Sequence, residues 1–111
     1  MIPNYLYNKN YHFLTPNSIL GNTNESEERK LSWELGVLIY KLIYGKYPFS
    51  REYKTLNEVF KQIFFNDIVL KTNIVNTSDL CNSIIVGLLN KDFTHRLSLH
   101  DSIFESWFNE M

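Results

Sequence analysis

The sequence contains no alanine, and it has one cysteine, four glycines and three prolines among its 111 residues. The single Cys81 excludes a disulfide within the chain and fits a reducing compartment. Lys and Arg number 11 against 12 Asp and Glu, so a basic nucleic-acid-binding surface is not expected. No apolar run reaches the ~18 residues of a membrane span, and no secretory signal is visible. We therefore expect an intracellular protein, cytoplasmic or nuclear, that binds neither nucleic acid nor membranes.

What is present suffices for a folded domain. Hydrophobic residues make up 44% of the chain and charged residues 21%, and the length fits a single domain over residues 1–111. Asn occurs 13 times and Ile 10 times, a bias that makes residue propensity a weak guide. Hydrophobic periodicity and motif spacing therefore carry the structural prediction.

The segment from Trp33 to Tyr44 is the most informative. At 100° per residue its uncharged positions cover roughly 260° of the helix circumference, which is typical of a helix buried inside a domain. Gly45 and Pro48 then predict its end. Three other helices are too few to cover so wide an arc, so we expect an uncovered apolar patch of a few hundred Å². The alternative is that the N-terminal segment covers it, through Tyr5, Leu6, Tyr7, Tyr11 and Phe13.

Three further segments predict amphipathic helices. Leu56 to Phe64 forms an aromatic face, and Asp79 to Leu89 forms an apolar face opened by Thr77 or Ser78 as N-cap. A capping box over residues 98–101, with Ser98 as the cap, opens the last helix. The chain as a whole is expected to divide into two parts. Residues 1–30 form an irregular lead-in, and residues 31–108 form the helical core.

Four motifs in the chain resemble a known family. Residues 33–49 resemble the pattern Asp-x-Trp-Ser-x-Gly-Val…Gly-x-x-Pro-Phe, and residues 88–98 resemble Leu-Leu-x-x-Asp-Pro-x-x-Arg-x-Thr/Ser. Residues 13–17 resemble Tyr-x-Ala-Pro-Glu, and Trp107 lies where the family ends on His-Pro-Trp. In this order, from about Tyr11 to Phe108, the chain resembles the distal half of the C-lobe of eukaryotic Ser/Thr protein kinases.

This resemblance implies a fold and a set of structural residues. The fold is mainly α: a partial protein-kinase-like C-lobe of about four helices, with an irregular, activation-segment-like N-terminal part. The positions that match the family's packing residues are Pro16, Trp33, Gly36, Pro48, Phe49, Asp92, Arg96 and Trp107.

The chain departs from the family at residues that support catalysis. Leu31 stands where the family has an Asp that accepts hydrogen bonds from the catalytic loop, and Lys9 and Asn10 replace a Gly-Thr pair. Asn17 replaces the Glu that pairs with Arg96. We therefore expect Arg96 to lose its charged partner. Glu25, Glu27 and Glu28 are expected to be a solvated run, with the alternative that one of them takes the partner's place.

No residue pattern in the printed sequence supports catalysis. It contains no glycine-rich loop, strand lysine, His-Arg-Asp or Asp-Phe-Gly motif, which kinases use to position ATP and magnesium. His12, His95 and His100 have no metal-ligand spacing with Cys81, which is expected to be an inert core thiol. We expect no catalytic, cofactor-binding or metal-binding residues, no bound ATP, and no enzyme activity from this chain by itself.

The leading hypothesis is a catalytically inactive remnant of a Ser/Thr kinase C-lobe that acts as a protein-interaction or regulatory module, with a protein partner or as a homo-oligomer. One alternative is a fragment of an active ATP-dependent kinase whose N-lobe and catalytic loop lie on another chain or were lost from the gene model. Another is an all-helical domain that matches kinases by chance. The candidate docking surface, which could also be simple core, consists of Leu56, Val59, Phe60, Ile63 and Phe64.

Overall fold

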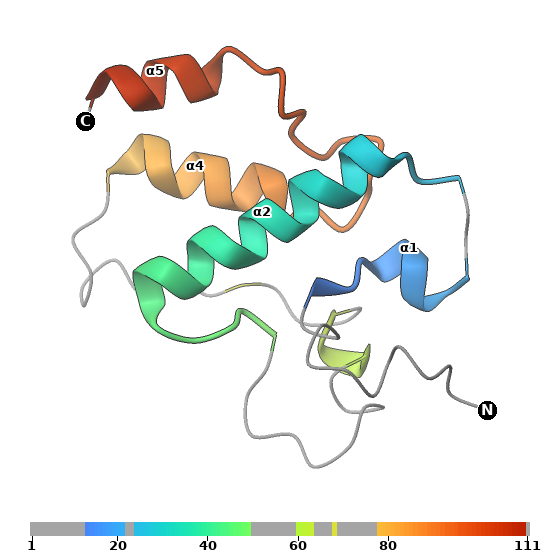
Figure 1. Ribbon diagram of the computed structural model, residues 1–111. Helices are drawn as coiled ribbons and strands as arrows, with labels where there is room; N and C mark the ends of the chain where they lie inside the picture. The colour runs from blue at the N-terminus through green and yellow to red at the C-terminus, as the bar shows by residue number, and fades with distance from the viewer. Residues whose placement is uncertain (1–12, 22–23, 50–59, 64–67, 69–77, 111) are drawn as a thin grey trace.

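The computed structural model describes residues 13–21, 24–49, 60–63, 68 and 78–110, and this part of the chain is mainly helical. Its named helices are α1 (Pro16–Ile19), α2 (Glu27–Tyr44), α4 (Asp79–Leu88) and α5 (Ile103–Glu110). Residues 60–63 form one more helical turn, and none of the described residues lies in a strand. Figure 1 shows α4 beside α2, α5 on the other side of α4, and α1 beneath the N-terminal half of α2. The prediction of a mainly α fold is confirmed.

Helix α2 is longer than the sequence predicts, because it begins at Glu27 rather than at Trp33. The Ser26 hydroxyl oxygen accepts a hydrogen bond from the Arg29 backbone N–H at 3.2 Å, which caps the helix. Two acidic residues in the first turn stabilise the positive end of the helix dipole. At the other end Gly45 adopts φ 76°, the left-handed conformation that ends helices most readily at glycine. Helix therefore extends into the predicted lead-in.

Helix α4 agrees with the prediction, whereas α5 begins later than predicted. The Ser78 hydroxyl accepts the Cys81 N–H at 3.0 Å and caps α4. Ser98 does not cap α5: its hydroxyl oxygen accepts the N–H of His100 at 3.1 Å, in a turn before the helix. Asp101 accepts the Ile103 N–H at 2.9 Å instead. The capping-box prediction at Ser98 is wrong because a local turn competes for that hydroxyl.

The core lies between α2 and α4. Trp33 and Val37 of α2 and Ile84 and Leu88 of α4 are completely buried. Gly36 allows the close approach, since a Cβ atom there would lie 2.8 Å from Leu88 Cβ. Helix α4 thus buries one face of α2, and it leaves the other faces of α2 to be covered by other segments or exposed to solvent.

Candidate functional site

The face of α2 that points away from α4 is lined with leucines and is largely uncovered. Leu31, Leu38 and Leu42 follow one another at helical spacing and expose 52%, 44% and 75% of their surface, and Leu35 between them is half-buried. We call these four residues the leucine face. They lie on the side of α2 away from Gly36, and they match the sequence prediction that part of this helix stays uncovered.

An open groove of about 670 Å³ runs over the N-terminal half of the leucine face. Its floor consists of Leu31, Leu35 and Leu38, together with one carboxylate, Glu34. Desolvation raises the pKa of the Glu34 carboxyl, and the nearby negative charge of Glu27 raises it further. The groove is therefore an apolar channel that holds a single acidic group.

One wall of the groove is Phe13 and Leu14, which a polar contact of the next residue holds in place. The Thr15 hydroxyl donates a hydrogen bond to Glu25 Oε1 at 2.6 Å, and its oxygen accepts the Ser18 N–H at the start of α1. Phe13 also packs edge-on against Tyr47, with ring centroids 5.8 Å apart. This wall is thereby joined to both ends of α2.

Leu99 forms another wall of the groove, and a glutamate of α2 holds it in place as well. Glu28 Oε1 accepts hydrogen bonds from the Leu99 N–H at 3.0 Å and from the Ser98 hydroxyl at 2.8 Å. The bond from Ser98 is the largest cause that lowers the pKa of the Glu28 carboxyl, followed by the bond from Leu99. Both walls are therefore attached by glutamates, Glu25 just before α2 and Glu28 in its first turn.

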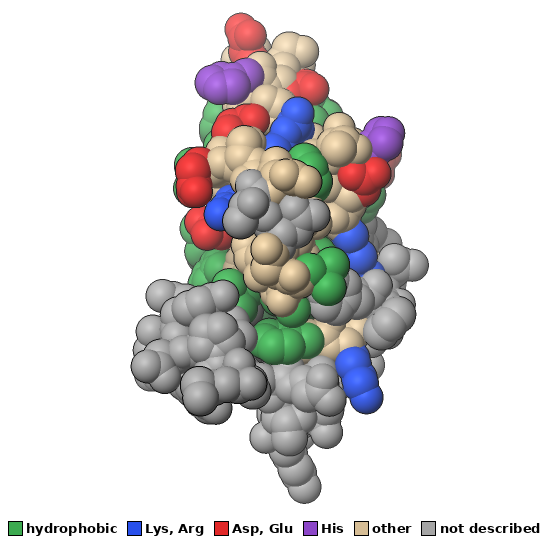
Figure 2. Space-filling model, turned by 90° about the vertical axis from the view of Figure 1, so that its right-hand side faces the viewer, with side chains coloured by type: hydrophobic (Ala, Val, Ile, Leu, Met, Phe, Trp, Pro, Cys, Tyr) green, Lys and Arg blue, Asp and Glu red, His purple; other side chains and the backbone are tan. Residues whose placement is uncertain are grey.

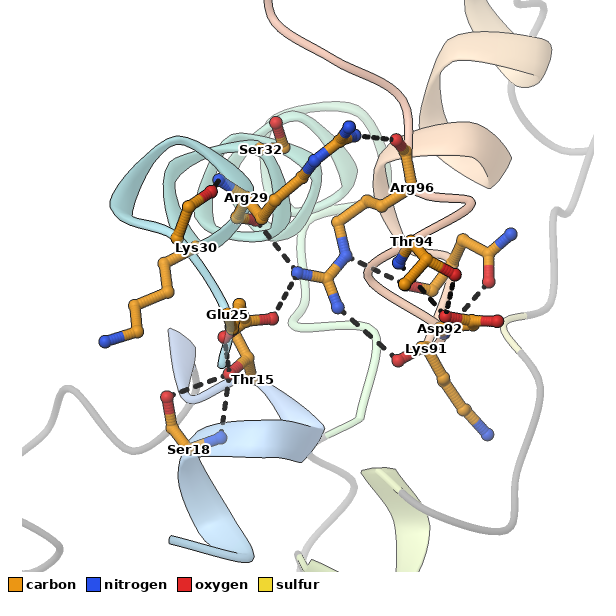
Figure 3. Close-up of polar contacts among 12 residues, drawn as sticks. Thr15, Ser18, Glu25, Arg29, Lys30, Ser32, Lys91, Asp92, Thr94 and Arg96 are labelled. Atoms are coloured by element: carbon orange, nitrogen blue, oxygen red, sulfur yellow. Dashed lines mark hydrogen bonds and ion pairs between the residues drawn. The ribbon is translucent and has the colours of Figure 1, made fainter. Parts of the chain in front are cut away.

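A buried ion pair underlies the first wall. Arg96 Nη1 lies 2.6 Å from Glu25 Oε2, and both side chains are fully excluded from solvent. The same guanidinium donates to the carbonyl oxygens of Arg29 and Asn90, each at 2.9 Å. Figure 3 shows it between Glu25, the first turn of α2 and the loop at residues 90–92. Burial lowers the pKa of the guanidinium, and the bond to Glu25 opposes that shift.

Two of the sequence predictions about this cluster need correction. Asn17 is not among the partners of Arg96 in the described part of the chain, yet Arg96 keeps a charged partner, because Glu25 supplies the carboxylate. Glu25 itself is buried and does not belong to a solvated run. The alternative that one of the nearby glutamates replaces the family's partner is correct, and the spacing of 71 residues is why local sequence patterns do not show it.

The family-like residues gather around this pair and around the core. The Trp33 ring stacks on Phe49 at 5.5 Å between centroids, and the Arg96 guanidinium lies 5.1 Å from the Trp33 ring centroid. Pro16 is buried in the first turn of α1, and Pro48 and Trp107 are half-buried. None of these side chains faces the groove.

Asp92 is exposed and organises the loop that faces Arg96. Its carboxylate accepts hydrogen bonds from the Thr94 hydroxyl at 2.6 Å and the Thr94 N–H at 3.0 Å, and it lies 2.8 Å from His95 Nδ1. These contacts, with Thr94 first, hold the pKa of Asp92 at about 2. The loop in turn presents the Asn90 and Lys91 carbonyl oxygens to the guanidinium.

The predicted docking surface over residues 56–64 is only partly described. Ile63 is 1% exposed and belongs to the core, so it cannot contribute to an exposed surface. Phe60 is half-buried, and Leu56, Val59 and Phe64 lie outside the described residues. The exposed leucines of α2 form another apolar surface in the described part of the chain.

The residues considered for metal or thiol chemistry lie apart. Figure 2 shows the two described histidines at opposite edges of one face. Among the described residues no three His, Cys, Asp or Glu side chains form a group that could hold a metal ion. Cys81 is buried, which raises the pKa of its thiol. None of the described helices is both long and apolar enough to cross a membrane.

Comparison with known proteins identifies relatives along most of the chain. The chain is 34% identical over 97 residues to the Ser/Thr-protein kinase par-4 of Caenorhabditis briggsae, and 33% identical over 97 residues to that of Caenorhabditis elegans. It is 32% identical over 98 residues to an Aurora kinase of Patiria pectinifera. These matches cover 86%, 86% and 88% of this chain, but only 14%, 15% and 22% of the three kinases.

No protein-family model matches the chain, and no solved structure matches it significantly. The relatives named here are nevertheless all protein kinases, since further matches are a calcium/calmodulin-dependent protein kinase kinase and Sgk1 kinases. The helical fold and the family-like residues around Arg96 are consistent with part of a kinase C-lobe. The chain is a homologue of the Ser/Thr protein kinases, matched over a short segment of their length.

Proposed function

We propose that the chain is a catalytically inactive relative of Ser/Thr kinases that acts by binding a protein through the leucine face of α2. The observation that carries the proposal is the exposure of Leu31, Leu38 and Leu42 beside the groove. Contiguous exposed apolar surface of this kind marks interaction sites, because leaving it in water is unfavourable.

The chemistry of the groove supports inactivity. Leu31 occupies the position of the family's hydrogen-bonding Asp, and an aliphatic side chain accepts no hydrogen bond. The printed sequence has no motif that would hold ATP or magnesium. The proposal includes a location in the cytoplasm or the nucleus, which the single cysteine supports.

The test has an activity arm and a binding arm. Purified chain is incubated with magnesium, radiolabelled ATP and a mixture of Ser/Thr peptides, beside an active Ser/Thr kinase as the positive control. We expect no incorporation above the blank. In the binding arm, light scattering measures the mass of the complexes that the wild-type chain forms. Leu38→Glu should lower that mass. Phosphorylation by the purified chain would refute the proposal.

A second candidate is one piece of an active kinase, and the extent of the matches favours it, because the relatives are several times longer than this chain. Reading the transcript upstream of the codon for Met1 tests it. In-frame His-Arg-Asp and Asp-Phe-Gly motifs, together with activity of the extended product, would support this candidate over the inactive module.

A further inference from the structure

The leucine face has two unlike ends. At its N-terminal end the groove, with Leu31 on its floor, is hollow and contains the Glu34 carboxylate. At its C-terminal end Leu42 protrudes, with 75% of its surface exposed, and Lys41 precedes it in the sequence. Leu31 and Leu42 are 11 residues apart, or about 16 Å along the helix axis. The same face therefore has an apolar groove at one end and, at the other, an apolar side chain that can insert into such a groove.

An antiparallel arrangement of two copies brings these ends together. A two-fold axis perpendicular to α2 reverses the helix direction, so Leu42 of one copy lies against the groove of the other, and the contact occurs twice. In the same register Leu35 of each copy lies near Leu38 of its partner. Helix α4 packs on the Gly36 side of α2, and Leu31, Leu38 and Leu42 stay exposed, so a second helix can reach them.

Charge complementarity selects the same register. Glu34 makes no hydrogen bond or close ion pair with the residues that the structure describes, and the charge of Lys30 is the smallest of the three influences on the pKa of its carboxyl. A wholly apolar partner would bury this charge without compensation, which is strongly unfavourable. The antiparallel register places Lys41 of the second copy opposite Glu34, on the same edge of the interface. Lys41 now lies 4.1 Å from the Tyr47 ring centroid, and its flexible stem allows the ammonium group to reach across.

We propose that the leucine face binds a second copy of this chain, as an antiparallel α2–α2 dimer in which Leu42 inserts into the partner's groove and Lys41 pairs with Glu34. This inference rests on the proposed protein-binding function and names its partner. A contact limited largely to one helix per copy is small, so the expected dimer is weak, with a Kd on the order of 10 μM.

Light scattering coupled to size-exclusion chromatography, with sedimentation equilibrium, tests the dimer over a concentration range of roughly 1 to 300 μM, chosen to span that Kd. We expect the mass to rise from 13.2 kDa toward twice that value. Leu42→Glu should weaken association at least about tenfold, since it introduces a charge into the partner's apolar groove. Val86→Glu is the matched control, because Val86 is also an exposed aliphatic side chain, on α4.

A charge exchange tests the pairing itself. Glu34→Lys and Lys41→Glu should each weaken the dimer about three- to tenfold, since like charges then face each other, and the double variant should restore wild-type affinity within about twofold. Glu105→Lys on α5 is the control for a change in net charge. Circular dichroism of each variant verifies that it is folded.

Three results would overturn the dimer: a single 13.2 kDa species at every concentration, unchanged association of Leu42→Glu, or a double variant no better than the single ones. A chain that stays monomeric could still bind a different protein, so that result does not affect the proposed function. Kinase activity, in contrast, would refute the proposed function and leave the dimer standing.

Discussion

Glu25 and Arg96 form a buried ion pair from positions 71 residues apart in the chain. A pair of this kind is not strong evidence of net stabilisation, because both charges lose their hydration. Removing one partner is a different matter, since the other is left buried and uncompensated. The consequence extends to the groove, because Glu25 also holds Thr15 and with it one wall.

Replacing Glu25 by Gln should therefore lower the free energy of unfolding by about 3 to 5 kcal/mol, and Arg96→Met should have a similar effect. Urea denaturation followed by circular dichroism measures both. Glu27→Gln is the control, because the Glu27 side chain is 86% exposed and its contact with Lys30 is worth little. Equal effects of the Glu25 and Glu27 substitutions would contradict the assignment.

Asp92 gives a prediction about pH. Its folded-state pKa of about 2 lies below the ordinary value, so its contacts contribute stability above about pH 4, and this contribution is lost as the pH falls toward 2. The carboxyl carbon of Asp92, followed by NMR, should titrate near 2. Thr94→Val removes the largest cause of the shift and should raise the midpoint. A midpoint that stays unchanged in this variant would show that the Thr94 hydroxyl does not hold the carboxylate.

At the scale of whole elements, hydrophobic periodicity and capping chemistry predict most of what is observed. The end of α2 at Gly45 and the start of α4 after Ser78 follow from short-range rules, and the structure agrees with both. The starts of α2 and α5 differ, because several serines and acidic residues compete as caps and only tertiary contacts decide between them. Ser98, for example, is bound by Glu28 of α2.

Gly36 tests the packing of α2 on α4. Gly36→Ala improves helix propensity by about 1 kcal/mol, yet the new Cβ atom would lie 2.8 Å from Leu88 Cβ and 2.9 Å from Leu89 Cδ2. We expect the clash to exceed the gain and a net destabilisation of about 1 to 2 kcal/mol, measured by thermal unfolding. Ser83→Ala, at an exposed position of α4, is the control and should be neutral or slightly stabilising. A stabilised Gly36→Ala variant would mean that α4 lies farther from α2.

For the molecule as a whole, the sequence predicts that α2 has more apolar surface than three helices can cover, but not where the excess lies. The groove combines residues from the N-terminal segment, α2 and the loop before α5, and no single-sequence pattern joins these three. The place of Glu34 beside the groove is equally invisible in the sequence, because the neighbours of a side chain are a property of the fold.

The dimer makes unfolding depend on concentration. Because association stabilises only folded chains, the midpoint of thermal unfolding should rise as the protein concentration is increased a hundredfold. Differential scanning calorimetry on wild-type chain and on Leu42→Glu measures this, and the variant should show little or no dependence. A wild-type midpoint that is constant over the range would contradict a folded dimer.

The long separation between Glu25 and Arg96 has a consequence for synthesis on the ribosome. Until residue 96 has left the exit tunnel, Glu25 lacks the arginine that it pairs with in the folded chain, and the wall that contains Thr15 has only its contacts to Glu25 and Tyr47. The earliest part of the described chain therefore reaches its final packing only after residue 96 has emerged. A pause in translation before codon 96 would prolong an intermediate in which α2 is formed while its neighbouring groove is not yet assembled.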